Sequence, residues 1–533
     1  MEYGITDERM HPMTNKSKSI IGGMTVLGLA GVICKLVGVL YSIPLTWMIG
    51  TQGLGVYNAV FPAYNLLLTI SSAGLPVAVS RLVARSLAKD DPRSAKNVFK
   101  TALLLLTVVG SVATIIMLAG SNLLAIASDQ PTSRIGFQVI APCVLLVCML
   151  SAFRGFMQGQ QNMTPTAISQ LIEQVGKVFL ALPMAYFGSK IGIEYGAAGA
   201  LLGTTIVEGI ALLYMIILYY RRRNAFASLP QLTEETPESR GIIARQLVGI
   251  SLPITIGACI VPLSQYIDST MLVGRLMSTG MAAETAASVY GLFSGTVIRI
   301  INIPTALALA VSMSLVPAIS SAKAVNDNDQ IVRQTDLGMR FAFLIGLPCS
   351  IGMSVLAEPL MRFFYEGSII EEELILGGEL LTMSGLTIIL FTVVQATTSV
   401  LQGLGKQRIP MYTLVAGVVC KIVLNYVLIA VPEINIHGAP IASLVCYSVS
   451  MLPNLFYMLK YTNSKMNWMG WIIRPGIATA AMGITVYAMR ELLPGGRLLL
   501  LAEVALGVVV FAVVALGVKA ITKEDLRAFR RRK

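Results

Sequence analysis

Long apolar stretches recur along almost the whole chain and are separated by short polar turns. A helix of about 20 apolar residues crosses the hydrocarbon core of a bilayer, so each stretch is long enough to span a membrane. The pattern lacks the alternation of a membrane β-barrel strand. It predicts fourteen membrane-spanning helices, over residues 20–48, 54–84, 98–121, 135–157, 164–187, 196–220, 244–272, 286–317, 337–357, 376–402, 409–431, 438–460, 469–489 and 497–519.

Composition agrees with an all-α integral membrane protein. Of the 533 residues, 55% are hydrophobic and 13% charged, and the mean hydropathy is +0.73. Soluble domains carry about 25% charged residues. Arg9, Lys16 and Lys18 precede the first apolar run, and no small-residue cleavage site follows it. We therefore expect the first helix to remain in the mature protein.

The basic residues predict the orientation of the chain. Most of the 40 lysines and arginines lie on alternate loops, including the tail Arg530–Lys533. Basic loops remain on the cytoplasmic side, so we expect both termini in the cytoplasm and the protein in the cell membrane. This rule also accounts for the net charge of +12, and we expect no nucleic-acid partner.

The sequence does not indicate an enzyme. It has no P-loop, no His-Glu-x-x-His and no Gly-x-Ser-x-Gly motif. Its seven cysteines lie singly in apolar spans, without a Cys-x-x-Cys pair, and the chain has two histidines. We expect no disulfide framework, no metal site and no cofactor.

One pattern occurs twice, 244 residues apart, and each copy places a lysine near the middle of a predicted span. The copies are Gln158-Gly159, Pro165 and Lys177, then Gln402-Gly403, Pro410 and Lys421. A second, weaker sequence similarity relates residues 75–80 to residues 316–320. Both shifts equal six spans, which predicts two parallel six-helix lobes related by a pseudo-two-fold axis. The alternative is two cytoplasmic turns that share Gly and Pro by chance.

These shifts predict the domain organisation. An N-lobe would cover residues 1–220 and a C-lobe residues 244–461, joined by a polar linker over residues 221–243. Two further helices would occupy residues 462–519, followed by a basic tail over residues 520–533.

Charges inside the predicted spans are candidates for function, because a charge at the bilayer centre costs about 2.5 to 3.5 kcal/mol even on insertion scales. The deep cations are Arg299, Lys421, Lys35 and Lys177; the carboxylates are Glu173, Glu208 and, nearer a span end, Asp268. The spacing of Glu173 and Lys177 also allows a simple i, i+4 ion pair. An excess of deep cations predicts a hydrated cavity between the lobes that holds an anion.

The sign of that excess separates two classes of transporter. A carrier of pyrophosphate-linked lipids needs cationic groups for phosphate oxygens, and Arg299 is the first candidate because arginine binds phosphate bidentately. A Na⁺- or H⁺-coupled drug antiporter would instead use Glu173, Glu208 or Asp268. A third hypothesis is a scaffold for cell-wall enzymes without transport. It predicts deep lysines in tight pairs and no cavity.

Four segments resemble the multidrug/oligosaccharidyl-lipid/polysaccharide (MOP) exporter superfamily, and within it the polysaccharide biosynthesis proteins that include stage V sporulation protein B and MurJ-like relatives. They are Gly53–Tyr57, Gly74–Ser80, Arg154–Pro165 and Ile172–Lys177. The resemblance implies fourteen helices in a MATE/MurJ-like V around a central cavity, with alternating access. It implies transfer of an undecaprenyl-pyrophosphate-linked sugar such as lipid II, with membrane lipids and cell-wall synthesis proteins as further partners.

Compared with MurJ-type flippases, Lys35 takes the place of an arginine, and Arg299 falls where those proteins have a cavity arginine. Tyr41-Ser42 replaces an Arg-Asp pair, and Ser71 and Ser72 stand where an arginine is expected. These departures favour the sporulation-type branch.

Overall fold

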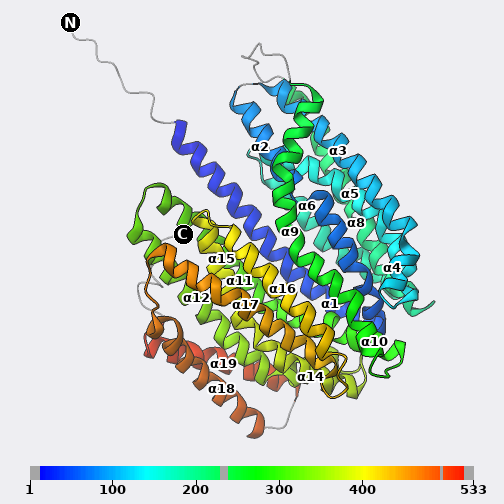
Figure 1. Ribbon diagram of the computed structural model, residues 1–533, viewed down its shortest axis with the longest axis vertical. Helices are drawn as coiled ribbons and strands as arrows, with labels where there is room; N and C mark the ends of the chain where they lie inside the picture. The colour runs from blue at the N-terminus through cyan, green and yellow to red at the C-terminus, as the bar shows by residue number, and fades with distance from the viewer. Residues whose placement is uncertain (1–11, 90, 228–237, 493–495, 521–533) are drawn as a thin grey trace. The chain divides into compact units, whose positions relative to one another are not determined.

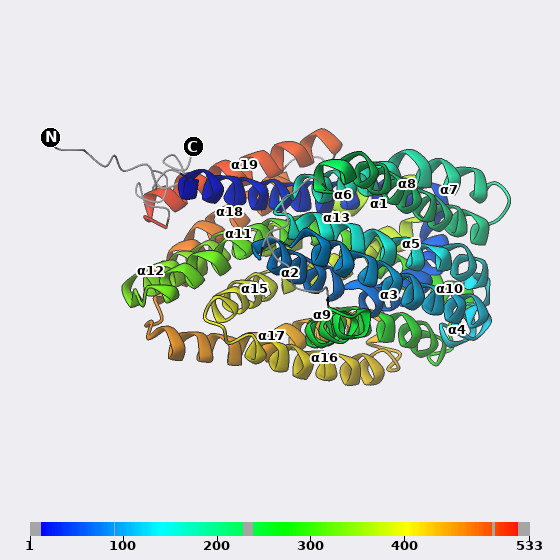
Figure 2. The same ribbon diagram turned by 90° about the horizontal axis from the view of Figure 1, so that it is seen from above.

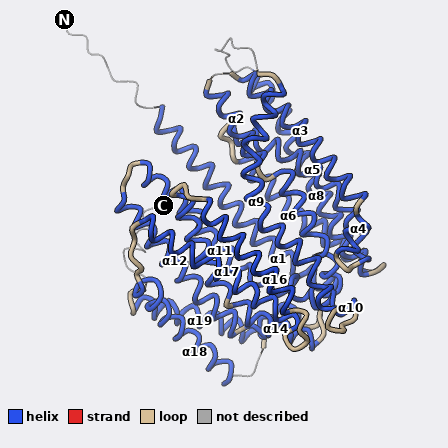
Figure 3. The backbone as a smooth tube through the Cα atoms, viewed as in Figure 1, coloured by secondary structure: helices blue, strands red, loops and turns tan. Residues whose placement is uncertain are grey.

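The computed structural model describes residues 12–89, 91–227, 238–492 and 496–520, and nearly all of them are helical (Figure 3). The described residues contain no strand, and one isolated bridge joins Glu366 to Ile369. The prediction of an all-α protein is confirmed.

The described residues of the first half of the chain form eight α-helices, one 3₁₀ turn and one π-helical turn. They are α1 (Pro12–Ser72), α2 (Leu75–Ala88), α3 (Pro92–Ala119), α4 (Ser121–Ala127), η1 (Pro131–Ser133), α5 (Arg134–Gly159), α6 (Thr164–Gly176), η2 (Lys177–Ala181), α7 (Leu182–Ser189) and α8 (Ile193–Ala227). Within the predicted linker, residues 228–237 lie outside the described part.

In the second half, the part that the structure describes forms eleven α-helices and three short helical turns. They are α9 (Arg240–Met277), α10 (Ala283–Gly291), η3 (Leu292–Val297), α11 (Ile298–Ala324), α12 (Asn328–Val355), α13 (Ala357–Tyr365), α14 (Glu371–Gly385), α15 (Thr387–Gly403), α16 (Arg408–Leu428), η4 (Asn435–His437), α17 (Gly438–Thr462), η5 (Met469–Ile473), α18 (Arg474–Leu492) and α19 (Arg497–Gly517). Of the predicted basic tail, residues 521–533 lie outside the described part.

The predicted count of fourteen spans is not confirmed, because twelve described segments are long and apolar enough to cross a membrane. The predicted span 164–187 is absent from the twelve. The backbone is helical from α6 through η2 into α7, but the π-helical turn divides it into pieces of 13, 5 and 8 residues. The predicted spans 20–48 and 54–84 also differ from α1, which runs to Ser72 across a bend at Gly50 (φ 64°, ψ −176°).

The chain folds into two compact units. Unit 1 comprises Met1–Gly38, Val60–Ala125 and Ser133–Pro262; unit 2 comprises Val39–Ala59, Ile126–Thr132 and Leu263–Lys533. The residues between Gly38 and Val60 thus group with the second half of the chain, although they belong to the first helix. The lobe boundaries derived from sequence stay a prediction.

In unit 1, α5 packs against α2, α3 and α8 (Figure 1). Glycine makes the contact with α2 possible. A Cβ at Gly159 would lie 2.7 Å from Val83 Cβ, and one at Gly155 would lie 2.8 Å from the Pro76 carbonyl oxygen. The backbones of α5 and α2 therefore approach closely at two successive turns of α5.

Unit 2 repeats this contact. Here α15 packs against α11, α12 and α17, and α16 runs alongside α17 (Figure 2). A Cβ at Gly403 would lie 2.7 Å from Ile319 Cβ on α11, and Ser320 Oγ donates a hydrogen bond to the Gly403 carbonyl oxygen (3.2 Å). Gly159 and Gly403 are the repeated glycines of the sequence. Each packs on the helix that contains the second, weaker sequence similarity, at residues 75–80 of α2 or 316–320 of α11. The matching contacts support duplication.

Candidate functional site: intramembrane charges

Unit 1 contains a buried charge cluster on three helices. Arg154 on α5 pairs with Glu173 on α6, and its Nε donates a hydrogen bond to Ser169 Oγ (2.9 Å). Lys177 Nζ lies 3.9 Å from Glu208 Oε1 on α8. The exposed fractions of these four charged side chains lie between 6% and 17%. The cluster holds two cations and two carboxylates, so its formal charge is balanced.

Lys177 begins the π-helical turn η2, which ends at Ala181. A π-helical turn inserts one extra residue into a helix and is often found at functional positions. Val207 on α8 closely faces Gly176, because a Cβ there would lie 2.6 Å from Val207 Cγ1. This close approach of the two helices puts Lys177 opposite Glu208.

Unit 2 contains a second ion pair, between Lys421 on α16 and Asp268 on α9. Asn425, one turn after Lys421, donates a hydrogen bond from Nδ2 to Asp268 Oδ1 (3.0 Å). The exposed fractions of the Lys421 and Asp268 side chains are 20% and 14%. Both oxygens of Asp268 are therefore bound, one by the ammonium and one by the amide.

Arg299 on α11 has a different environment. Its Nη2 donates a hydrogen bond to Asn58 Oδ1 at 3.4 Å, and its guanidinium lies 5.7 Å from the centre of the Tyr57 ring. Asn58 and Tyr57 are buried, whereas Arg299 is half-buried. Among the described residues, no carboxylate lies within 4.0 Å of this guanidinium. Arg299 is thus held by neutral groups, and a π-helical turn, η3, ends two residues before it.

These contacts correct the charge count made from sequence. Asp268, which was predicted to lie nearer a span end, neutralises Lys421, and Arg154, which was not among the predicted deep cations, binds Glu173. The Lys35 side chain lies outside the described part of the structure. Of the three predicted cations whose side chains are described, Lys177 and Lys421 have carboxylate partners. A cavity shared by the predicted residues stays a prediction.

Sequence reasoning also missed a polar cluster beside the Gly50 bend of α1. Thr51 Oγ1 and Ser288 Oγ donate hydrogen bonds to Glu373 Oε1 at 2.9 Å and 2.6 Å. Trp47 Nε1 donates a hydrogen bond to the Phe364 carbonyl oxygen (2.6 Å). These contacts fix the residues around the bend against α10, α13 and α14. The glycine at position 50 was the available signal, because a φ of 64° favours glycine.

Outside the predicted membrane segments, Arg362 on α13 also belongs to an ion-pair network. It binds Glu358 and Glu371. Hydrogen bonds to Glu371 and Glu358 raise the pKa of the Arg362 guanidinium above its ordinary value.

Comparison with models of known protein families identifies the family of this chain. The model of the polysaccharide biosynthesis protein family matches residues 20–323, which is more than half of the chain. The chain belongs to the polysaccharide biosynthesis protein family. The MatE family model also matches this member, over residues 253–427. Membership in the MOP exporter superfamily, predicted from sequence, is confirmed.

Relatives and solved structures agree with this assignment. This family member is 28% identical to the lipid II flippase MurJ of Bacillus subtilis (strain 168), over 83% of each chain. It is 27% identical to stage V sporulation protein B of the same organism, over 80% of each chain. The structure matches a lipid II flippase MurJ in an inward closed conformation (TM-score 0.71, 11% identity, 92% of this chain and 98% of that chain).

It also matches a multidrug resistance MATE family transporter in an inward-facing conformation (TM-score 0.69, 15% identity, 80% of this chain and 94% of that chain). The predicted MATE/MurJ-like fold is confirmed. The family member is a multi-span membrane protein of the transporter type.

Proposed function

We propose that this protein is a flippase that moves an undecaprenyl-pyrophosphate-linked precursor of peptidoglycan or polysaccharide across the cell membrane. Its relatives include a lipid II flippase and a sporulation protein. The observation that carries the proposal is Arg299. This intramembrane guanidinium is half-buried, and it contacts a neutral amide and an aromatic ring.

Such a guanidinium suits a pyrophosphate. Arginine presents its N–H donors in a planar fork that matches two phosphate oxygens, and hydrogen bonds to charged groups contribute about 1.5 to 3 kcal/mol each. The bond to Asn58 spans 3.4 Å, which is long for a hydrogen bond, so exchanging it for a phosphate oxygen costs little. Lys421 and Lys177 act after Arg299, because each must first leave a carboxylate.

Transport would follow alternating access, with the head group in a cavity and the polyprenyl chain in lipid. Both termini would face the cytoplasm, as the distribution of basic loops predicts. A membrane potential is a sufficient energy source, because it contributes about 2.3 kcal/mol per elementary charge per 100 mV.

A Na⁺- or H⁺-coupled multidrug antiporter is the second candidate, favoured by the match of the MatE model to residues 253–427. That function needs carboxylates able to exchange cations. Glu173, Glu208 and Asp268 each face a lysine or an arginine instead. Releasing one of these carboxylates for a coupling ion would leave a buried cation unpaired, which is unfavourable.

The test compares the variants Arg299→Ala and Arg299→Lys in proteoliposomes that contain lipid II or another undecaprenyl-pyrophosphate glycan. Loss of two charge-assisted hydrogen bonds predicts at least a hundredfold slower flipping for Arg299→Ala, and partial activity for Arg299→Lys. Arg275→Ala is the matched control, because Arg275 also faces an aromatic ring, 3.3 Å from the centre of Tyr426.

Assays with and without a membrane potential identify the energy source, and comparison of the two glycans identifies the cargo. Flipping by Arg299→Ala at the wild-type rate would refute the role of this residue. Drug efflux that depends on a Na⁺ or H⁺ gradient, without any lipid flipping, would establish the antiporter instead.

A further inference from the structure

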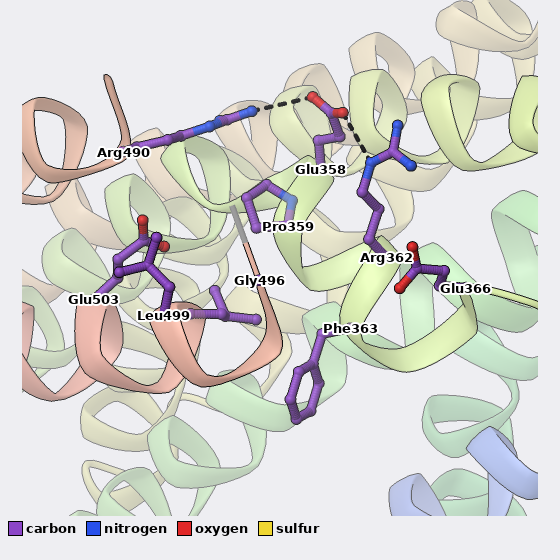
Figure 4. Close-up of a pocket in the computed structure, with 10 residues that line it drawn as sticks. Glu358, Pro359, Arg362, Phe363, Glu366, Arg490, Gly496, Leu499 and Glu503 are labelled. Carbon is purple, nitrogen blue, oxygen red and sulfur yellow. Dashed lines mark hydrogen bonds and ion pairs between the residues drawn. The ribbon is translucent and has the colours of Figure 1, made fainter. Parts of the chain in front are cut away.

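A pocket of about 360 Å³ lies in unit 2, where α13, the end of α18 and the start of α19 meet (Figure 4). All three helices reach the pocket beside the end of a candidate membrane span, at Val355, Leu492 or Leu498. The pocket therefore belongs to the boundary between the lipid core and the aqueous phase. It is separate from the Arg299, Lys421 and Lys177 contacts described above.

The two arginines that line the pocket are each paired with a carboxylate. Arg490 donates hydrogen bonds to Glu358 Oε2 (3.0 Å) and to the Val355 carbonyl oxygen (2.9 Å). Arg362 Nε donates to Glu358 Oε1 (3.1 Å), and its Nη1 donates to Glu371 Oε2 (3.1 Å). Figure 4 shows both guanidinium groups directed at Glu358. Each arginine is thus already compensated.

Glu503 is a further carboxylate of the pocket lining. It lines the pocket from the second turn of α19, and its exposed fraction is 3%. No hydrogen bond or ion pair joins its carboxylate to another described residue, and Figure 4 draws none. Arg490 acts on this carboxylate electrostatically, at a distance longer than an ion pair. The Glu503 oxygens therefore keep acceptor positions for hydrogen bonds, so the pocket favours a cationic ligand.

The lining and the volume of the pocket favour an organic cation over a metal ion. The described residues contain no group of three metal-ligating side chains, whereas Ca²⁺ and Mg²⁺ need about six or more oxygen ligands. The volume far exceeds that of a single ion, and Phe363, Pro359 and Leu499 supply apolar lining. We propose that this pocket binds a ligand that carries a primary ammonium group, with the ammonium on Glu503 and the adjoining carbon atoms on the apolar lining.

A primary ammonium at a membrane boundary has two sources. It belongs either to a phospholipid headgroup, phosphoethanolamine, or to a small free amine. In the headgroup, the phosphate would lie on the side of the arginines. The lining of this pocket shares no residue with the Arg299, Lys421 and Lys177 contacts, so the proposal holds whatever the cargo is.

The experiment measures binding of phosphatidylethanolamine to the full chain by native mass spectrometry. Phosphatidylcholine, which has a quaternary ammonium without N–H donors, is the comparison lipid. Wild-type protein is expected to bind phosphatidylethanolamine at least tenfold more tightly than phosphatidylcholine, because the charge-assisted hydrogen bond to Glu503 exists for the first lipid alone. In Glu503→Gln, the preference is expected to fall below twofold.

Glu491→Gln is the matched control, because Glu491 is an exposed carboxylate near the end of α18 that does not line the pocket. It should keep the full preference. Soluble ethanolamine, titrated against protein in phosphatidylcholine, tests the second source: binding that requires Glu503 assigns the site to a free amine. A wild-type protein that binds neither compound selectively, or a Glu503→Gln variant that keeps the preference, would overturn the proposal. The thermal unfolding temperature of each variant verifies that it is folded.

Discussion

The ion pair between Lys421 and Asp268 offers the sharpest test of whether a deep lysine serves stability or transport. The perturbation is a double-mutant cycle with Lys421→Met, Asp268→Asn and the double variant. Met keeps most of the apolar volume of Lys. Asn at position 268 keeps an acceptor for Asn425, which now binds the carboxylate at 3.0 Å. The cycle therefore removes charge with little change of shape.

The expected magnitudes follow from the burial of the pair, whose side chains are 20% and 14% exposed. Removing one partner of a buried ion pair costs about 3 to 5 kcal/mol, because the other charge is left unpaired. Partial exposure places the loss at about 3 kcal/mol for Lys421→Met and about 2 kcal/mol for Asp268→Asn. The double variant leaves no unpaired charge and should change the free energy of unfolding by about 0 kcal/mol. The coupling energy is then about 5 kcal/mol.

The assay is unfolding of each reconstituted variant by a denaturing detergent, followed by tryptophan fluorescence. A double variant that loses the sum of the two single effects would refute the contact. Flipping rates then distinguish a structural role of Lys421 from a role in cargo binding. A stable double variant with wild-type flipping makes Lys421 a structural residue, whereas a stable but inactive one assigns the lysine to cargo binding.

Two further predictions concern packing and charge in the helices that carry the repeat. Gly159→Ala and Gly403→Ala should each lower the free energy of unfolding by about 1 to 3 kcal/mol, because the new Cβ would lie 2.7 Å from a neighbouring Cβ; Gly476→Ala, at an open position, should not. The same unfolding assay checks this, and equal stability of all three variants would contradict it. Glu173→Gln should lower stability by about 3 kcal/mol, because Arg154 loses its buried carboxylate. Restoration by Arg154→Met in the double variant checks the pairing.

Hydropathy predicted most of the fold because a membrane helix must bury apolar side chains in lipid over its whole length. The predicted break between residues 48 and 54 coincides with the Gly50 bend. The break at Gly74 was missed. Pro76 lacks an N–H and disfavours a helical residue before it, and α2 begins at Leu75. The signal of Pro76 is local, and the hydropathy of the surrounding apolar run does not show it.

The candidate site was less predictable than the fold. Sequence spacing reveals partners on the same helix, and Lys421 has none there. Its carboxylate partner, Asp268, is 153 residues away in the chain. Such pairs depend on how helices pack, which hydropathy does not encode. The depth of Lys177 and Lys421 in the membrane stays a prediction, and the sequence did not reveal that Glu208 and Asp268 are their carboxylate partners.

Aligning the two halves of the chain by the repeat shift of 244 residues shows how the surroundings of Lys177 and Lys421 differ. It aligns Arg154 with Thr398, and Ser169 with Thr413. In unit 2, Thr413 Oγ1 donates a hydrogen bond to Asn454 Oδ1 (2.8 Å), and Asn454 Nδ2 donates to Thr398 Oγ1 (3.4 Å). A neutral amide on α17 therefore links α15 and α16, where unit 1 uses an arginine. The duplicated helices kept a polar link at this position but not its charge.

The two lysines also differ in the position of their carboxylate partners. Lys177 faces Glu208 on the next helix, within a cluster that includes a second ion pair. Lys421 has a single carboxylate, contributed by α9, and no other charged side chain pairs with it in the described part of unit 2. A phosphate can displace one carboxylate more easily than it can enter a balanced cluster of four charges. Under the proposed function, Lys421 is therefore better placed than Lys177 to assist Arg299.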